Sequence, residues 1–498
     1  MPVRGICEAM TTHHYLACDL GAESGRVLLG TLTKGRLALQ EIHRFSNGPV
    51  AVGGTLRWDL LRVFEELKAG LRKAAAGGAS PSSISCDSWG VDYVLFRKNE
   101  PMLTLPFHYR DPRTDGGLER AFAVVPADDI FAETGIQFMA INTLYQLHDD
   151  LRKRPEILNL ADGFLNIGDY FNFLLSGRDV AEESLASTTQ LYSPRLRDWS
   201  AMLIDRFGFP ARIFAEIVPS GTALGKIRAS VSEETGLDGA EIIAGCSHDT
   251  AAAVAAVPAS SGDWAYLSSG TWSLLGIESA EPIIDAKSRR YNFTNEVGYG
   301  GAIRFLKNIV GLWLIQECRR EWASHGHEYS YEELAQMAAA SPPFESLIDP
   351  TREELLKPGQ MPEKIAAFCR ATGQPAPETP GAVVRSALES LALLYRRTLE
   401  QLEDASGRKV NTLHIVGGGS KNQLLNQFTA NATQRTVLAG PSECTGLGNV
   451  IVQAIALGHL SSLDAARESV RESFPTVRYT PADTSAWNQA YDRFMSFV

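Results

Sequence analysis

The 498-residue chain has few cysteines, and their spacing suits neither a disulfide framework nor a zinc site. The cysteines are widely scattered, odd in number, and never form a C-x-x-C pair. We therefore expect reduced, mostly buried thiols in a cytoplasmic protein. The seven residues concerned are Cys7, Cys18, Cys86, Cys246, Cys318, Cys369 and Cys444.

Long apolar runs and an excess of positive charge are also missing. No uninterrupted apolar run approaches the ~18 residues of a membrane span, and the start MPVRGICEAMTTHHY lacks the apolar core of a secretion signal. Lys and Arg number 47 against 58 Asp and Glu, a net charge of −11. We expect no membrane or nucleic-acid partner, because no global positive field attracts either one. An anionic ligand would have to be held locally.

The composition is that of an ordinary globular protein, with 44% hydrophobic and 21% charged residues. At about 150 residues per domain, the length corresponds to roughly three domains or two large ones. Helix-like and strand-like segments alternate along the chain, which favours an α/β fold.

A hairpin pattern occurs twice. Near the start, two apolar runs flank the polar, glycine-containing turn at 22–26, and the same pattern surrounds the turn at 268–271. Two such hairpins, each opening a long α/β stretch, indicate two related lobes. The small, polar stretch 257–263 is the predicted boundary, which places the lobes at 12–257 and 258–498.

The sequence also predicts individual helices, strands and loops. Asp59 is expected to cap a helix that begins at Leu60, and SISCDSWGVDYVLF to form a strand pair. The stretches 341–362 and 373–381 are expected to be surface loops. Thr379 is expected to cap a long helix with Pro380 in its first position.

The two hairpin turns are candidate phosphate-binding loops. The first offers glycine-freed backbone N–H groups, the Ser24 hydroxyl and the Arg26 guanidinium, and Asp19 could hold the water shell of a metal ion. One such turn alone is more typical of an ordinary hairpin turn with Asp19 hydrogen-bonded to it. Two turns from opposite lobes could hold one polyphosphate between them.

Asp249 follows a predicted strand and turn and begins an alanine-rich helix. An ionised Asp there could accept a proton from a substrate hydroxyl that attacks a phosphoryl group, or it could simply cap the helix. The same segment comes close to a hydrolase nucleophile elbow centred on Ser247, although Asp249 replaces the second glycine of that motif.

Further segments suggest contacts with a sugar and a nucleotide. Trp89 and Tyr109 place aromatic faces beside polar groups, as sugar sites do. The glycines at 417–419, after a predicted strand at 412–416, fit two interpretations equally: close approach of an adenine or a phosphate to the backbone, or a turn that serves packing alone.

Taken in order, these segments resemble the FGGY carbohydrate kinases, and the resemblance covers nearly the whole chain. The segments that carry it are DLGAESGRV at 19–27, DSWGVDYVL at 87–95, YRDPRTDG at 109–116, GIQFMAINTLYQL at 135–147, STTQLY at 187–192, SHDTA at 247–251, YLSSGTWSLLG at 266–276, LKNIVGLWLIQ at 306–316 and LHIVGGGSKNQLLNQ at 413–427. The resemblance implies two ribonuclease-H-like lobes of the actin/hexokinase/Hsp70 superfold with a cleft between them.

The resemblance also implies roles for individual positions. It assigns ATP phosphate contacts to Ala22, Glu23, Ser24, Gly25, Arg26 and Thr271, and further nucleotide contacts to Gln316 and Gly418. It assigns sugar contacts to Gly90, His248, Asp249, Thr250 and Asn308, the general base to Asp249, and a water-mediated magnesium contact to Asp19. The first lobe would thus bring sugar and phosphate contacts, and the second nucleotide contacts.

The expected activity is ATP- and Mg²⁺-dependent phosphorylation of the 1-hydroxyl of L-rhamnulose, with L-fuculose or L-xylulose as alternative substrates. A non-catalytic sugar-binding regulator is the alternative from another class, and a monomer or a homodimer is expected. The turn departs from the family pattern at Glu23, since relatives acting on L-rhamnulose commonly have Ala-Ser-Ser there. We expect Glu23 to point away from the triphosphate, because two negative groups repel.

Overall fold

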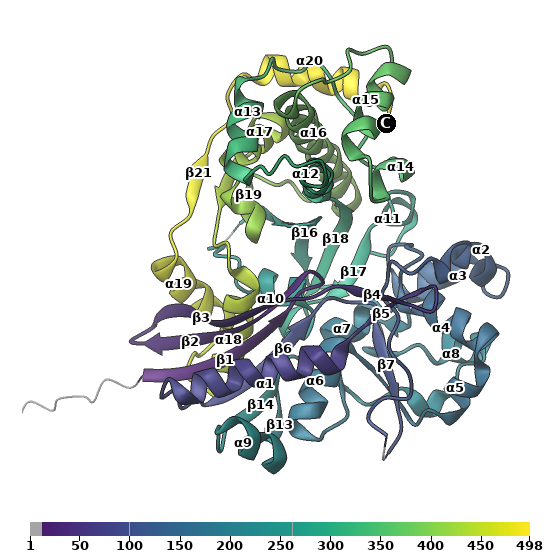
Figure 1. Cartoon of the computed structure of the whole chain (residues 1–498), viewed down its shortest axis with the longest axis vertical. Helices are drawn as coiled ribbons and strands as arrows, with labels where there is room; N and C mark the ends of the chain where they lie inside the picture. Colours follow the sequence, from purple (N-terminus) through teal and green to yellow (C-terminus); the bar gives the residue numbers. More distant parts are fainter. Residues whose placement is uncertain (1–11, 99, 261) are drawn as a thin grey trace, which may run out of the picture.

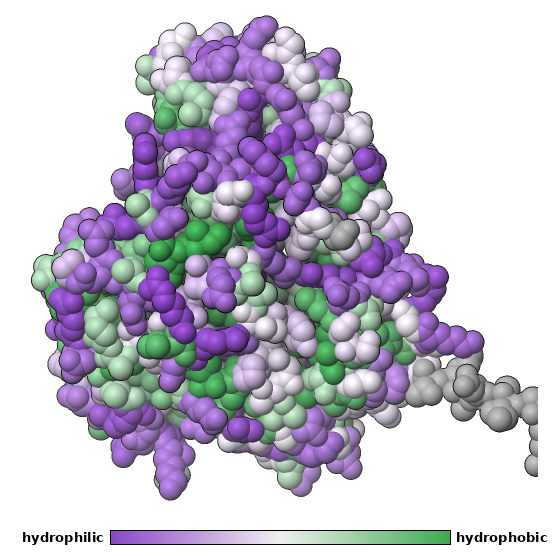
Figure 2. All heavy atoms as spheres, turned by 180° about the vertical axis from the view of Figure 1, so that it is seen from behind, coloured by the Kyte–Doolittle hydropathy of each residue, from purple (hydrophilic) through white to green (hydrophobic). Residues whose placement is uncertain are grey.

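The computed structural model describes residues 12–98, 100–260 and 262–498, so Cys7 lies outside the described residues. The chain forms two lobes (Figure 1), with the N-terminal half below and most of the C-terminal half above. Hydrophilic residues cover most of the upper lobe as seen from behind, while apolar residues gather near the waist and over the lower lobe (Figure 2).

The N-terminal lobe is built on a six-stranded sheet of order β13-β14-β6-β1-β2-β3. Strands β1, β2 and β3 are antiparallel neighbours, and β6 joins β1 in parallel, as β14 joins β6. The strands are β1 (Thr12–Leu20), β2 (Ser24–Thr33), β3 (Arg36–Ser46), β6 (Ser83–Ser88), β13 (Thr222–Lys226) and β14 (Glu241–Ala244).

Alternating side chains of β1 bury both faces of this sheet. Leu16, Cys18 and Leu20 pack with helices α1 (Leu60–Ala76) and α6 (Ile167–Ser176) on one face. Tyr15 and Ala17 pack on the other with α10 (Asp249–Ala255) and α18 (Cys444–Ala456). Period-two alternation in a strand covered on both sides explains why β1 is almost continuously apolar.

The C-terminal lobe repeats the arrangement. Its seven-stranded sheet has the order β17-β18-β16-β15-β19-β20-β21, again an antiparallel group of strands joined to parallel ones. When β13 is left out of the lower sheet and β17 and β21 out of the upper one, both sheets share the order third, second, first, fourth, fifth: β3-β2-β1-β6-β14 below and β18-β16-β15-β19-β20 above. The expected pair of ribonuclease-H-like lobes is confirmed. The strands are β15 (Trp264–Ser269), β16 (Trp272–Ser279), β17 (Thr294–Val297), β18 (Ile303–Val310), β19 (Thr412–Val416), β20 (Thr436–Ala439) and β21 (Val477–Tyr479).

The remaining elements surround these sheets. In the N-terminal lobe they are β4 (Pro49–Val52), β5 (Thr55–Trp58), β7 (Tyr93–Phe96), η1 (Pro112–Thr114), α2 (Gly117–Phe122), α3 (Ala127–Thr134), α4 (Thr143–Lys153), α5 (Pro155–Leu160), β8 (Gly163–Asn166), β9 (Ala181–Glu182), α7 (Glu183–Thr188), β10 (Tyr192–Ser193), β11 (Asp198–Trp199), α8 (Ala201–Phe207), η2 (Ala211–Ile213), β12 (Ile217–Val218) and α9 (Ala229–Thr235). In the C-terminal lobe they are α11 (Ala286–Arg290), η3 (Tyr299–Gly301), α12 (Trp313–Ser324), α13 (Tyr331–Ala340), α14 (Glu353–Leu356), α15 (Met361–Ala371), α16 (Pro380–Ser406), η4 (Gly418–Lys421), α17 (Gln423–Thr433), α19 (Leu463–Ser473) and α20 (Thr484–Met495).

Several sequence predictions are confirmed in detail. The Asp59 carboxylate accepts a hydrogen bond from the Arg62 N–H at 3.1 Å and caps α1. Thr379 caps α16 in the same way, with Pro380 as its first residue. The six described cysteines are buried and unpaired. No described helix is both long and apolar enough to cross a bilayer.

Two predictions were wrong. Strands β6 and β7 do not pair with each other, because β6 lies in the main sheet whereas β7 pairs with β8. The stretch 341–362 is not a surface loop throughout, since Leu347 and Ile348 are fully buried and α14 lies within it. Prolines and polar residues predicted a loop there, but the few apolar side chains pack into the core of the upper lobe.

Helices α10 and α18 cross between the lobes, so closely that their backbones touch at a glycine. A Cβ atom at Gly448 of α18 would lie 1.7 Å from the Ala252 carbonyl oxygen of α10. Two polar residues of α18 reach the lower sheet beside this crossing: Gln453 donates to the Leu16 carbonyl at 3.1 Å, and Asn449 donates to the Ser85 carbonyl at 3.2 Å. The crossing therefore fixes the upper lobe against the lower one.

We expect Gly448→Ala to destabilise the protein by about 2 kcal/mol or more, although alanine favours helices. The cause is the backbone clash, which no side-chain rotation relieves. Urea unfolding measures the effect. Gly77→Ala is the matched control, because a Cβ there meets nothing closer than 3.4 Å, and it should change stability by no more than about 0.5 kcal/mol. A Gly448→Ala protein as stable as its parent contradicts the proposed tight crossing.

Candidate active site

Three carboxylates gather at the carboxyl end of the lower sheet. Asp19 on β1 and Asp87 on β6 are direct neighbours in the parallel register, and both are buried. The Ser88 N–H donates to the Ser247 carbonyl at 2.8 Å, which joins the end of β6 to the segment before α10. Asp249 follows as the first residue of α10, with its side chain 29% exposed.

Burial and mutual repulsion shape the protonation of this group. Burial, and next the charge of Asp19, raise the pKa of Asp249 to about 7. The same two causes raise the pKa of Asp87 well above its usual range. Arg26 offsets part of this charge by pairing with both Asp19 and Glu443. A cluster of this kind at a cleft is typical of catalytic sites.

Asp249 does not cap α10 through its side chain. The N-cap position belongs to His248, and the Asp249 Oδ1 atom accepts a hydrogen bond from the Thr250 hydroxyl at 3.0 Å. The neighbouring Ser247 is fully buried. A hydrolase nucleophile must be accessible to its substrate, so this burial counts against the nucleophile-elbow hypothesis.

The first hairpin turn lies between β1 and β2 and is braced by its own backbone. The Gly21 N–H donates to the Ser24 carbonyl at 2.9 Å, and the Asn47 side chain donates to the Gly21 carbonyl at 2.9 Å. The Glu23 carboxylate accepts from Arg320 of α12, in the other lobe, at 3.2 Å. Glu23 therefore has a cationic partner across the lobes.

The second turn lies in the upper lobe beside two other predicted nucleotide contacts. The Thr271 carbonyl accepts the Gly311 N–H at 3.2 Å, just before α12, whose first turn carries Gln316. The glycine run after β19 packs against the same hairpin, because a Cβ at Gly419 would lie 2.0 Å from the Ser269 hydroxyl. Gly418 itself has open space around it. The structure thus brings Thr271, Gln316 and Gly418 to one wall.

The predicted sugar contacts come from both lobes. Gly90 lies against α7, where a Cβ would approach the Thr188 hydroxyl to 3.0 Å. Asn308 on β18 is held by Gln137 of the lower lobe, whose amide oxygen accepts from the Asn308 N–H at 2.9 Å and Nδ2 at 3.1 Å. The bonds of Asn308 thus run to Gln137 and not to Asp249.

Several residues at this site carry no local sequence signal. Asn449 of α18 donates to the Asp87 carboxylate at 2.6 Å, and Arg304 of β18 donates to the His248 ring at 3.0 Å. Both partners are distant in sequence and meet only across the lobes. Asp87 and Gln137 lie in segments that carried the family resemblance, so comparison within the family could have found them.

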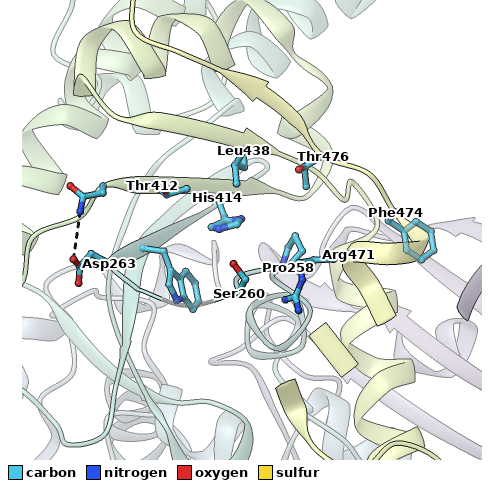
Figure 3. A pocket seen from close by; sticks show the side chains of 11 residues that line it. Pro258, Ser260, Asp263, Thr412, His414, Leu438, Arg471, Phe474 and Thr476 are labelled. Atoms are coloured by element: carbon cyan, nitrogen blue, oxygen red, sulfur yellow. Dashed lines mark hydrogen bonds between the residues drawn. The ribbon is translucent and has the colours of Figure 1, made fainter. Parts of the chain in front are cut away.

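A cavity of about 340 Å³ lies away from these residues (Figure 3). Trp264, Thr412 and His414 line it, at or near the starts of β15 and β19. The predicted nucleotide contacts Thr271 and Gly418 follow the opposite ends of these strands. The cavity is therefore separate from the candidate active site.

Solved structures of other proteins share the fold of this chain. A gluconate kinase from Lactobacillus acidophilus superposes with a TM-score of 0.80 over 98% of this chain and 97% of its own, at 15% identity. A xylulose kinase from the same organism gives 0.80 over 97% of each chain, at 16% identity. These likenesses show the fold of two-lobed sugar kinases.

The family itself is shown by sequence. The N-terminal domain of the FGGY family of carbohydrate kinases matches residues 14–256, and its C-terminal domain matches residues 265–457. The chain is 43% identical to a rhamnulokinase of Bacteroides thetaiotaomicron over 97% of its length and 99% of that protein. It is 41% identical to a rhamnulokinase of Enterococcus faecalis over 98% of each. The chain belongs to the FGGY family of carbohydrate kinases.

We expect Asp249→Asn to stabilise the protein at alkaline pH. Because the folded pKa of about 7 lies above the unfolded value of 3.8, the folded state binds the proton more tightly. The stability of the parent protein therefore falls as pH rises from about 4 to about 7. At about pH 8 the free energy of unfolding of the variant should exceed that of the parent by about 2 kcal/mol. This is roughly half of what the difference between the folded and unfolded pKa values gives, because solvent screens the partly exposed side chain.

Urea unfolding at about pH 5 and pH 8 measures this gain. Asp238→Asn, at an exposed carboxylate, is the matched control and should show no such pH-dependent gain. A variant that is no more stable than its parent at the higher pH contradicts the electrostatic account of the site.

Proposed function

We propose that this kinase transfers the γ-phosphoryl group of ATP to the 1-hydroxyl of L-rhamnulose. The observation that carries the proposal is the position of Asp249, which is partly exposed and lies near Asp19, at the end of the strand that leads into the first turn. The substrate is inferred from near-full-length relatives, 41–43% identical, that are named rhamnulokinase.

Asp249 is assigned as the general base. A carboxylate whose pKa is about 7 is well matched to accepting a hydroxyl proton near neutral pH. It is the first residue of α10, and its side chain is 29% exposed. Gly90, His248, Thr250 and Asn308 are assigned as sugar contacts around it.

The phosphate-binding residues are assigned to both lobes. The turn at 22–26 and Thr271 would bind the phosphates, and Gln316 and Gly418 would contact the rest of the nucleotide. The open space around Gly418 suits close approach of a ligand to the backbone. The proposed division of work is therefore sugar and phosphate contacts in residues 12–257 and nucleotide contacts in residues 258–498.

The donor chemistry also fits a magnesium ion. Among the described residues no three His, Cys, Asp or Glu side chains are grouped to hold a metal alone. Asp19 supplies oxygen ligands, and its negative charge, which together with the larger effect of burial raises the pKa of Asp87, would favour a divalent cation. Asp19 would hold the ion through water, and the bound ion would neutralise charge on the transferred phosphoryl group.

Contacts between the lobes would control access of water. The Glu23–Arg320 and Arg26–Glu443 pairs join the first turn to the upper lobe at the edge of the site. Closure around sugar and nucleotide would exclude water, which otherwise competes as the phosphoryl acceptor. A cytoplasmic location and a monomeric or homodimeric state complete the proposal.

A panel of ketoses tests the substrate. With ATP and Mg²⁺, we expect ADP release to depend on added sugar and to be fastest, by kcat/KM, with L-rhamnulose. L-fuculose, L-xylulose and D-fructose are the comparison substrates, measured by coupled ADP detection. A higher kcat/KM with another ketose would replace the substrate assignment, and ADP release without any sugar requirement would contradict the kinase proposal.

The Asp249→Asn enzyme should lose about 10²–10⁴-fold in turnover while still binding the sugar, because it lacks only the proton acceptor. In the parent enzyme, kcat/KM should fall about tenfold per pH unit below about 7, where Asp249 becomes protonated. Steady-state rates over pH and sugar binding by calorimetry provide the measurements. Near-normal turnover of Asp249→Asn would falsify the base assignment, whereas Asp238→Asn should behave as the parent.

A further inference from the structure

Arg304 is a fully buried arginine between the lobes. Its side chain, from β18 of the upper lobe, is 0% exposed and contacts three groups. Its Nε donates to the Val297 carbonyl at 3.1 Å, and its Nη2 donates to the His248 Nδ1 at 3.0 Å. The Glu296 carboxylate lies 3.1 Å from the same Nη2. Burial of a guanidinium is costly, so Glu296 is needed to balance its charge.

The bond to His248 determines where the imidazole proton resides. A guanidinium stays protonated and can only donate hydrogen bonds, so Nδ1 of His248 must be the acceptor. The neutral ring then carries its proton on Nε2, because one nitrogen donates when the other accepts. Burial and the charge of Arg304 also lower the pKa of His248 well below its usual range, which keeps the ring neutral.

The protonated nitrogen faces the candidate active site. The His248 Nε2 atom lies 3.5 Å from the Asp249 Oδ1 atom. In the other tautomer, a lone pair would point toward this carboxylate and toward the oxygens of a bound sugar. The lone pair would repel the Asp249 carboxylate and the sugar oxygens. The Nε2–H tautomer instead presents a donor to them.

We propose that Arg304 is a positioning residue that holds His248 in its Nε2–H tautomer, so that the imidazole donates to the substrate oxygen beside Asp249. The inference rests on the proposed function, because the hydroxyl that reacts is taken to be the one beside Asp249, the assigned general base. Arg304 itself contacts neither the proposed base nor, on this assignment, the sugar. Glu296 serves as its charge partner and also lies 3.5 Å from His248 Nδ1.

The first test needs no substrate. In protein labelled with ¹⁵N-histidine, we expect the His248 ring to show protonated Nε2 and unprotonated Nδ1 between about pH 6 and pH 8. The signal is identified by its loss in His248→Gln. In the double variant Arg304→Met/Glu296→Gln, which removes the ion pair without stranding one charge, the ring should become a mixture of tautomers. Protonated Nδ1 in the parent protein, or an unchanged ring in the double variant, overturns the inference.

The second test uses whichever ketose the parent enzyme phosphorylates fastest. We expect the double variant to raise the KM for the sugar about tenfold and to lower kcat about tenfold, with the KM for ATP unchanged. Arg304→Lys, which keeps one charged donor, should recover part of this loss. In a His248→Gln background the same Arg304 and Glu296 changes should cost less than about twofold, because no tautomer remains to be selected.

Matched controls separate positioning from general damage. Lys307→Met changes another basic residue of β18, three positions along the strand, and should leave both KM values within about twofold of the parent. Equal rises in the KM for sugar and ATP, or an undiminished loss in the His248→Gln background, would indicate a merely structural role and overturn the inference. Failure of the proposed function shows differently, as a parent enzyme inactive on L-rhamnulose while the ring keeps its Nε2–H pattern.

Discussion

The close crossing of α10 and α18 is the contact on which the rest of the site depends. The glycine at 448 lets the two helix backbones meet. Helix α10 begins with Asp249, and α18 contains Asn449, which donates a hydrogen bond to Asp87. Each lobe alone would leave an apolar helix face and several polar groups unpaired. Because the crossing belongs to both lobes, the carboxylates of the candidate site are placed by the joint packing of the lobes and not by either sheet alone.

Three carboxylates lie close together in the candidate site, and their mutual repulsion lowers the stability of the folded protein. Asp19, Asp87 and Asp249 repel one another, and Asp87 Oδ1 has no hydrogen-bond partner among the described residues. Arg26 relieves this repulsion only in part. The carboxylates therefore disfavour the charged folded state, and a cationic ligand would stabilise it. Destabilised charge of this kind is common where a protein must bind a metal–nucleotide complex and accept a proton.

Cationic side chains connect the lobes around the site. Arg26 reaches Glu443, Arg320 reaches Glu23, and Arg110 stacks over the Trp313 ring at 4.3 Å. Glu23 thus has a partner that offsets its charge. That partner, Arg320, is 297 positions away in the sequence and belongs to the other lobe.

Sequence by itself determined the α/β class, the repeated hairpin, the helix caps at Asp59 and Thr379 and the family, because these depend on local periodicity, turn chemistry and collinear motifs. It also singled out Asp19 and Asp249 as candidates. Only the tertiary structure decided that β7 leaves the main sheet and that Arg304, Asn449 and Gln137 support the site. These contacts join residues from different lobes, and no local pattern records a pairing that forms only when the lobes pack together.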